Sequence, residues 1–295
     1  MLPSGSKRTI QETLQKILKN NSKIIKFSSK SKFEDSNVYR LSELKPAGTK
    51  LILEPKTELI ELLKLTLFDL TLKQVLIIKK TLKKSHSRDP HLREYILVET
   101  GKNFSKYTPN KFEQYFTKRI DEDSYFQLKT YLREIFKEIP SEHKYKKEII
   151  HNLKINDLFK NNLISSVFSW FKTNPKGNKL KKDITEYLNE VDRNIENLIE
   201  NEPDKALELI LFLQGNIFLL TKLKFELLEK LKLISTVRSS NDDKYYDDWF
   251  WIDFMHDSDL SISDLISEIS EVFDSIDDYF DFDSGEDWDA DFDFD

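Results

Sequence analysis

Two stretches of this chain concentrate side chains that can neutralise phosphate. Residues 137–182 carry eleven lysines against four acidic residues, and residues 73–93 carry seven basic residues against one acidic residue. Aromatic rings such as Tyr145, Phe159 and Trp170 lie among the first set. Nucleic acid offers such a surface phosphates to neutralise and bases to stack on. Because lysine outnumbers arginine in both stretches, we expect point-charge contacts with phosphates and not recognition of base edges.

We assign the predicted nucleic-acid contacts to eleven lysines from the two stretches. They are Lys73, Lys79, Lys80, Lys83, Lys84, Lys144, Lys146, Lys147, Lys179, Lys181 and Lys182. Lysines also coat the solvated faces of ordinary helices, and the aromatic residues between them would then belong to the core. A purely structural role for both stretches is therefore the alternative.

Residues 85–91 bring together side chains suited to metal binding or hydrolysis. His86, Asp89 and His91 are close in sequence, and such a set can ligate a metal or assist phosphodiester cleavage. Their serine, arginine and proline neighbours are more typical of a polar surface loop. The chain has no glycine-rich phosphate loop, no G-x-S-x-G and no H-E-x-x-H. We therefore predict no catalytic activity, no cofactor and no metal site; an enzyme built on this loop is an alternative that His86→Ala or His91→Ala would test.

The segment 242–295 is strongly acidic. It contains 21 of the 52 acidic residues of the chain and, in Lys244, one of its 46 basic residues. The other 241 residues thus hold 45 basic and 31 acidic residues, a formal charge of +14 against −20 for the segment. A basic body joined to an acidic tail predicts that the tail and a polyanion compete for the same surface.

The aromatic residues of this tail support a second interpretation. We assign docking onto a partner to Phe280, Phe282, Trp288, Phe292 and Phe294. These rings would fill pockets on a basic partner protein while the carboxylates meet its rim. A third interpretation is that the tail only maintains solubility. Under the competition hypothesis, removal of residues 242–295 should tighten non-specific nucleic-acid binding and steepen its dependence on salt.

The composition excludes some classes of protein. The chain contains no cysteine, which rules out disulfides and zinc–thiolate sites. Its most apolar stretch, residues 206–220, includes Glu208 and Gln214 and is too short to cross a bilayer. The first twenty residues carry charges where a signal peptide needs an apolar run. We expect a soluble, cytoplasmic protein that does not bind membranes, with its oligomeric state left open.

Hydrophobic spacing predicts mostly helices, with short strands in the first half of the chain. The expected helices span residues 9–19, 57–67, 71–82, 109–120, 121 or 123 to 139, and part of 141–171. The expected strands span residues 23–27, 38–41, 50–53 and 94–99. A helix-turn-helix can be drawn through residues 57–84, but its second helix would be apolar nearly all round. We therefore interpret that second helix as part of the core.

The clearest structural pattern covers residues 180–231. Apolar residues at helical spacing run as far as Leu198, are interrupted at Asn201-Glu202-Pro203, and resume through Leu231. Two long helices joined by so short a turn should pack antiparallel as an αα-hairpin.

The acidic tail also contains a helical pattern. Apolar residues between Ile262 and Ile276 keep helical spacing, and Ser261 or Ser263 would cap this helix, which should end near Asp278. From Phe280 onward, repulsion among aspartates that alternate with aromatic residues should prevent folding until a cationic surface is met.

These patterns predict a mainly α-helical protein with a minor β element in its first half, a long antiparallel αα-hairpin and a partly disordered acidic tail. We divide it into a mixed, mostly helical segment 1–140, a helical segment 141–238 with the hairpin, and the acidic segment 239–295. The predicted function is a non-catalytic, nucleic-acid-associated or regulatory binding protein, whose basic body binds phosphate backbones and is inhibited by its own tail. The alternative is a scaffold subunit of a larger assembly, whose Asp/Phe tail docks onto a basic partner.

Overall fold

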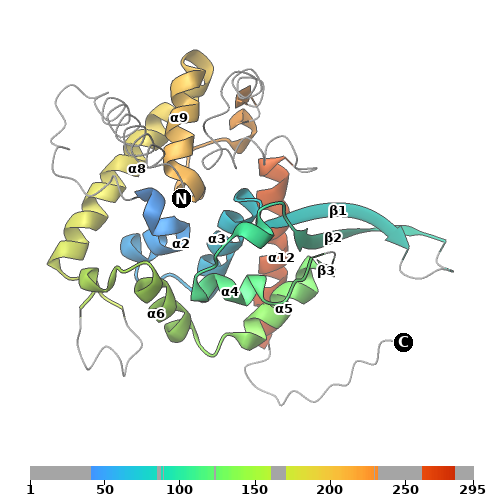
Figure 1. Cartoon of the computed structure of the whole chain (residues 1–295). Helices are drawn as coiled ribbons and strands as arrows, with labels where there is room; N and C mark the ends of the chain where they lie inside the picture. The colour runs from blue at the N-terminus through green and yellow to red at the C-terminus, as the bar shows by residue number, and fades with distance from the viewer. Residues whose placement is uncertain are drawn as a thin grey trace, which may run out of the picture.

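The protein is mainly α-helical, as the sequence predicts, and a small antiparallel sheet projects from its helical body (Figure 1). The computed structural model describes residues 41–84, 88, 90–122, 124–160, 171–228, 230–231 and 261–282. The predicted helix at 9–19 and strand at 23–27 lie outside the described residues. Of the predicted strand at 38–41, only Leu41 is described, and it begins a helix.

The first two described helices supply much of the buried core. Helix α2 (Leu41–Leu53) is kinked at Lys45, which takes a φ of 52° and is followed by Pro46. The predicted strand at 50–53 is wrong, because these residues form the end of α2, where Leu51 and Ile52 are fully buried. Helix α3 (Leu59–Leu72) confirms the prediction at 57–67 and continues for one further turn.

The sheet contains three strands in the order β1-β2-β3. They are β1 (Leu76–Lys84), β2 (Leu92–Thr100) and β3 (Tyr125–Gln127). Strand β2 confirms the prediction at 94–99, whereas the predicted helix at 71–82, and with it the helix-turn-helix, is wrong. Gln74 takes a φ of 53°, which ends the helical path after Lys73. The following residues then pair with β2. An apolar run fits a helix or a strand equally well, and the hydrogen bonds to β2 make this one a strand.

Three short helices cover the base of the sheet and the adjoining body. They are α4 (Lys111–Thr117), α5 (Leu128–Glu138) and α6 (Glu142–Asn152). The prediction at 109–120 is confirmed. Helix α5 begins later than predicted, because residues 125–127 pair with β2 as β3. The Ser141 hydroxyl accepts a hydrogen bond from the Lys144 backbone N–H at 3.2 Å and caps α6.

The predicted αα-hairpin is present as α8 (Pro175–Asn201) and α9 (Pro203–Leu213). Proline occupies the first turn of both helices, and the Asn174 side chain caps α8 by accepting from the Gly177 N–H at 2.9 Å. The second arm ends at Leu213 and does not reach residue 231 as predicted. The helix ends there because Gln214 takes a φ of 49°, outside the helical region, and further along the chain the Asp192 carboxylate accepts hydrogen bonds from the backbone N–H groups of Thr221 and Lys222.

The last described helix, α12 (Ile262–Phe282), belongs to the acidic tail. The Ser261 hydroxyl accepts from the Asp264 N–H at 3.0 Å, which confirms the predicted cap. The helix continues past Asp278 to Phe282, so the expected loss of structure from Phe280 is wrong for its first residues. Ile262, Leu265, Ile269 and Phe273 are buried in the same core as α2 to α9. The three-segment division of the chain stays a prediction.

Candidate nucleic-acid interface

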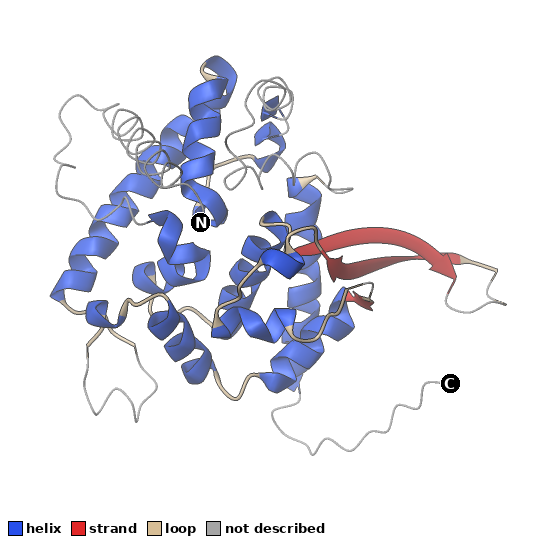
Figure 2. Ribbon diagram, in the orientation of Figure 1, coloured by secondary structure: helices blue, strands red, loops and turns tan. Residues whose placement is uncertain are grey.

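Strands β1 and β2 form a two-stranded ribbon that extends well beyond the helices (Figure 2). Four of the eleven predicted lysines, Lys79, Lys80, Lys83 and Lys84, lie on β1. The register places Lys83 directly opposite Arg93 and Lys80 opposite Ile96. Because residues directly opposite one another in an antiparallel pair share a face, this register assigns every side chain of the ribbon to one of two faces.

One face, which we call the inner face, lies toward the helices. It carries the even-numbered side chains of the ribbon, from Leu76 and Thr100 at the base to Lys84 and Leu92 at the end. Lys80 of this face forms ion pairs with Glu94 at 3.3 Å and with Glu268 of α12. The hydrogen bond that the Lys80 ammonium donates to the Glu268 carboxylate is the main reason that the pKa of Lys80 lies above its usual value. The acidic tail helix is therefore in direct contact with one of the predicted phosphate-binding lysines.

The opposite face, which we call the outer face, combines cations with tyrosine rings. It carries the odd-numbered side chains, which are Ile77, Lys79, Thr81, Lys83, Arg93, Tyr95, Leu97 and Glu99, together with Tyr125 of β3. The Lys83 Nζ atom lies 4.1 Å from the centroid of the Tyr125 ring, a cation–π contact. Lys79 pairs with Glu99 at 2.7 Å. Lys83 and Arg93 stand directly opposite each other, which places two cationic side chains side by side at this end of the ribbon.

The ribbon is anchored to the body immediately before β1 and after β2. The Lys73 ammonium pairs with Asp69 of α3 at 2.5 Å, and the Asn103 side chain donates to the Lys73 carbonyl at 2.9 Å. The Gly101 N–H donates to the Val75 carbonyl at 2.8 Å, and a Cβ at Gly101 would collide with the Gln74 backbone. Lys73 therefore belongs to the anchor of the ribbon and not to its exposed surface.

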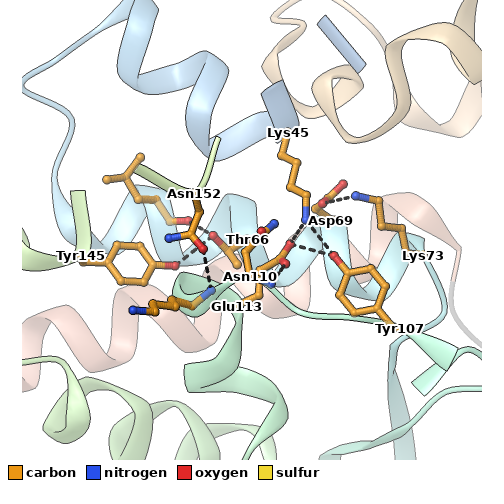
Figure 3. A network of polar contacts seen from close by, with 11 residues as sticks. Lys45, Thr66, Asp69, Lys73, Tyr107, Asn110, Glu113, Tyr145 and Asn152 are labelled. Carbon is orange, nitrogen blue, oxygen red and sulfur yellow. Dashed lines mark hydrogen bonds and ion pairs between the residues drawn. The ribbon is translucent and has the colours of Figure 1, made fainter. Parts of the chain in front are cut away.

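A buried polar network lies beside this anchor (Figure 3). The Lys45 ammonium donates to the Glu113 carboxylate and to the Tyr107 hydroxyl, and that hydroxyl donates to Glu113 at 2.9 Å. The other Glu113 oxygen accepts from the Asn110 N–H at 2.7 Å and closes a capping box on α4. Burial lowers the pKa of Lys45, and burial together with the charges of Glu113 and Asp69 raises the pKa of Tyr107. The three groups satisfy one another, which is typical of a structural brace between α2 and α4.

The remaining predicted lysines lie across the body from the ribbon, on α6 and α8 (Figure 1). Lys144, Lys147, Lys179 and Lys182 are exposed and Lys181 is half-buried. Lys146 is buried and pairs with Glu142 at 2.5 Å, so it contributes no charge to the surface. The eleven lysines therefore divide between the ribbon, its anchor and the far side of the body, and do not form one continuous surface.

The tail residues assigned to docking are described only in part. Phe280 and Phe282 lie in the last turn of α12, while Trp288, Phe292 and Phe294 lie outside the described residues. His86 and Asp89 also lie outside them, and His91 is exposed at the end of the ribbon. Among the described residues, no group of three His, Cys, Asp or Glu side chains is placed to hold a metal ion.

Sequence reasoning missed Arg93, Tyr95 and Tyr125 as members of the interface. A signal for the first two was present, because residues 92–100 alternate as a strand does and follow a short polar segment after a lysine-rich run. Pairing the two runs as a hairpin would have set Arg93 near Lys83. Nothing in the local sequence indicated that Tyr125 joins the same face.

Comparison with protein-family models, with curated proteins and with solved structures gave no match. Among the described residues, no helix has both the length and the apolar character needed to cross a bilayer.

Proposed function

We propose that this protein is a non-catalytic nucleic-acid-binding protein whose β1–β2 ribbon contacts phosphates. The observation that carries the proposal is the placement of Lys83 directly opposite Arg93 at the exposed end of the ribbon. Two cationic side chains held side by side can both contact one phosphate, and such charge-assisted contacts are the strong ones.

The acidic helix α12 supports a regulatory part of the proposal. Glu268 forms an ion pair with Lys80. Further exposed carboxylates along the same helix belong to Asp264, Glu271 and Asp274. These charges would compete with a phosphate backbone that approaches the inner face of the ribbon. The competition between tail and polyanion that the sequence predicts thus has a specific candidate contact, Lys80 with Glu268.

The structure changes the experiment that tests this competition. Removal of residues 242–295 would delete α12 and expose the core around Phe273, which is fully buried and packs 6.4 Å from the Phe136 ring. Such a truncation would report on folding instead of binding. Substitutions on the surface of α12 keep the helix in place and are the proper test.

Neutralising the outer-face cations should weaken binding to nucleic acid. In the triple variant Lys79→Gln/Lys83→Gln/Arg93→Gln, we expect the slope of log affinity against log salt to fall by about 2.7, with affinity roughly 100-fold lower near 0.1 M salt. Titration of labelled polynucleotide at several salt concentrations measures both quantities. The matched control is Lys144→Gln/Lys147→Gln/Lys179→Gln, which removes the same charge from the far side. Equal losses in the two variants, or no loss in the first, would contradict the proposal.

Removing the carboxylate that contacts Lys80 should tighten binding slightly. We expect Glu268→Gln to raise affinity about 2- to 5-fold, since exposed ion pairs are weak and the competitor is one charge among several. The control Glu271→Gln removes an equal charge from an exposed position of the same helix. A larger gain for Glu268→Gln than for the control, measured in the same titration, supports direct competition. Unchanged affinity in Glu268→Gln argues against any competition at Lys80.

A second candidate function, that of a scaffold subunit, is favoured by the end of the inner face. Leu82 and Leu92 are 62% and 59% exposed there, and exposed apolar residues of this kind are typical of protein contacts. In this proposal a partner covers the two leucines, and the Asp/Phe tail docks onto a basic surface of the assembly. A pull-down performed with and without nuclease separates the two functions, because partners held by nucleic acid are lost after nuclease treatment.

A further inference from the structure

The outer face of the ribbon carries two different kinds of binding chemistry side by side. Lys83 and Arg93 provide positive charge, Lys79 lies beside them in an ion pair with Glu99, and Tyr95 and Tyr125 provide aromatic rings. Tyr125 is 57% exposed, an unusual degree for so large a ring, and Tyr95 is half-buried. Positive charge alone would attract any polyanion. The exposed rings also allow stacking, which only a polyanion that carries planar bases can use.

We infer that the outer face binds single-stranded nucleic acid, with bases stacked on Tyr95 and Tyr125 and phosphates neutralised by Lys79, Lys83 and Arg93. This inference rests on the proposed function and specifies its ligand. Bases in a duplex are already stacked on each other and cannot reach an exposed ring, whereas unpaired bases gain by stacking on one. The exposed tyrosines therefore favour a single strand over a duplex.

The order of side chains along the outer face suits a strand that runs along the ribbon. Tyr95 stands opposite Thr81, between the Lys79 and Lys83 positions of the neighbouring strand. A ring is thus flanked by cations on both sides, as successive bases and phosphates require. Because Thr81 is small, it leaves room for a base above the Tyr95 ring.

The contact between Lys83 and Tyr125 places a cation that can bind phosphate beside a ring on which a base can stack. The ammonium lies over one side of the ring, which orients the ring and leaves its other side as the stacking surface. A phosphate bound to the same ammonium would lie beside a base stacked on the ring. Arg93, directly opposite Lys83, offers a second contact to that phosphate.

The inner face is a poor site for the same ligand. Near the body, Lys80 is held by Glu268 and the surface of α12 is acidic. At the end of the ribbon, Leu82 and Leu92 are exposed beside Lys84 and Glu94, and two such apolar side chains suit a wedge between the base pairs of a duplex. Binding of a duplex through these leucines is the competing outcome that the experiment must detect.

The test compares the two tyrosines with matched substitutions in the full-length protein. Tyr95→Val/Tyr125→Val removes both rings and keeps β-branched residues in the strands, while Tyr95→Phe/Tyr125→Phe keeps the rings. Fluorescence anisotropy is measured with one labelled oligonucleotide, either single-stranded or annealed to its complement. We expect the valine variant to lose roughly 30-fold or more in affinity for the single strand, and the phenylalanine variant to stay within about 3-fold of the parent protein. Affinity for the duplex should change little in either variant.

A second measurement does not depend on the valine variant being folded. Quenching of tyrosine fluorescence by the single strand should be larger in the parent protein than in Tyr95→Phe/Tyr125→Phe, which lacks these two of the eleven tyrosines, and smaller with the duplex. Equal affinity of the valine variant and the parent for the single strand would overturn the inference, as would a preference for duplex that Leu82→Ser/Leu92→Ser abolishes. Parent protein that binds both oligonucleotides through its cations, with no role for the tyrosines, overturns the inference and leaves the proposed function intact. Binding to neither oligonucleotide overturns both.

Discussion

Replacement of Glu113 by alanine should lower the free energy of unfolding by about 3–5 kcal/mol. The Glu113 side chain is 1% exposed and accepts hydrogen bonds from Lys45, Tyr107 and the Asn110 N–H. Its removal leaves the Lys45 ammonium in a poorly solvated position without a counter-charge, and α4 without the second half of its capping box. The loss of the counter-charge and the loss of the cap both lower the free energy of unfolding. Urea unfolding of the variant and the parent protein, followed by circular dichroism, measures the difference.

The double variant Glu113→Ala/Lys45→Met provides the control. Because the charge that Glu113 compensates is then absent, we expect the double variant to recover part of the stability that Glu113→Ala loses. Methionine replaces the lysine side chain as far as its ε carbon without the charged nitrogen, and strains the positive φ at position 45 no further than lysine does. A double variant as unstable as the sum of the two single variants would show that the pair is not coupled.

The network also bears on the ribbon, since Asp69 contributes to the electrostatic environment of both Lys45 and Tyr107 and pairs with Lys73 at the ribbon anchor. The base of the ribbon is thus fixed by charged groups that are largely buried. This explains how a two-stranded ribbon, which is marginal in isolation, can extend from the body with a defined register.

The helices of this protein could be predicted where local signals mark their ends. Asn174-Pro175 begins α8, Pro203 begins α9 and Ser261 caps α12, and each signal acts within one turn of the helix it starts. The ribbon was missed because β1 is stabilised by a partner strand about twenty residues away. The apolar run at 75–78 fits a helix or a strand, and only pairing with β2 decides.

The candidate site was predictable in composition but not in arrangement. The lysine-rich run identified four ribbon lysines, yet it could not tell them from Lys73 and Lys146, whose ammonium groups are held by acidic partners within their own helical turns. The pairing of Lys83 with Arg93 depends on strand register, which no local pattern encodes. The tail helix was predicted from its spacing, but its burial in the core required knowledge of the surface it covers.

Alkaline pH should unfold this protein steeply above about pH 10. Burial raises the pKa values of Tyr107, Tyr131, Tyr145 and Tyr187 above the value of 10.0 expected in an unfolded chain. Below pH 10 these hydroxyls are protonated in both states, and their contribution to stability is fully present. Above it, the unfolded chain loses protons that the folded protein keeps, so stability falls as pH rises. Each tyrosine contributes about 1.4 kcal/mol per pH unit, and four together about 5 kcal/mol per pH unit.

Lys45 acts in the opposite direction over a limited range. Burial lowers its pKa below 10.5, so between the folded and unfolded values the unfolded chain binds more protons and stability rises with pH. This single proton offsets one tyrosine at most, and its effect ends near pH 10.5, where both states become neutral. The tyrosines therefore dominate above that pH, and the net slope is negative.

A pH titration followed by tyrosinate absorbance and circular dichroism tests this expectation. Because these four of the eleven tyrosines ionise only when the chain opens, the last part of the tyrosinate absorbance should appear in the same steep transition as the loss of the helical signal. The control Tyr187→Phe removes one titrating group at a position where the ring packs 6.1 Å from Phe212, and should reduce the slope of stability against pH by about 1.4 kcal/mol per unit. Tyrosinate absorbance that rises to its full value while the helical signal is intact would contradict the burial of these side chains and the core in which they lie.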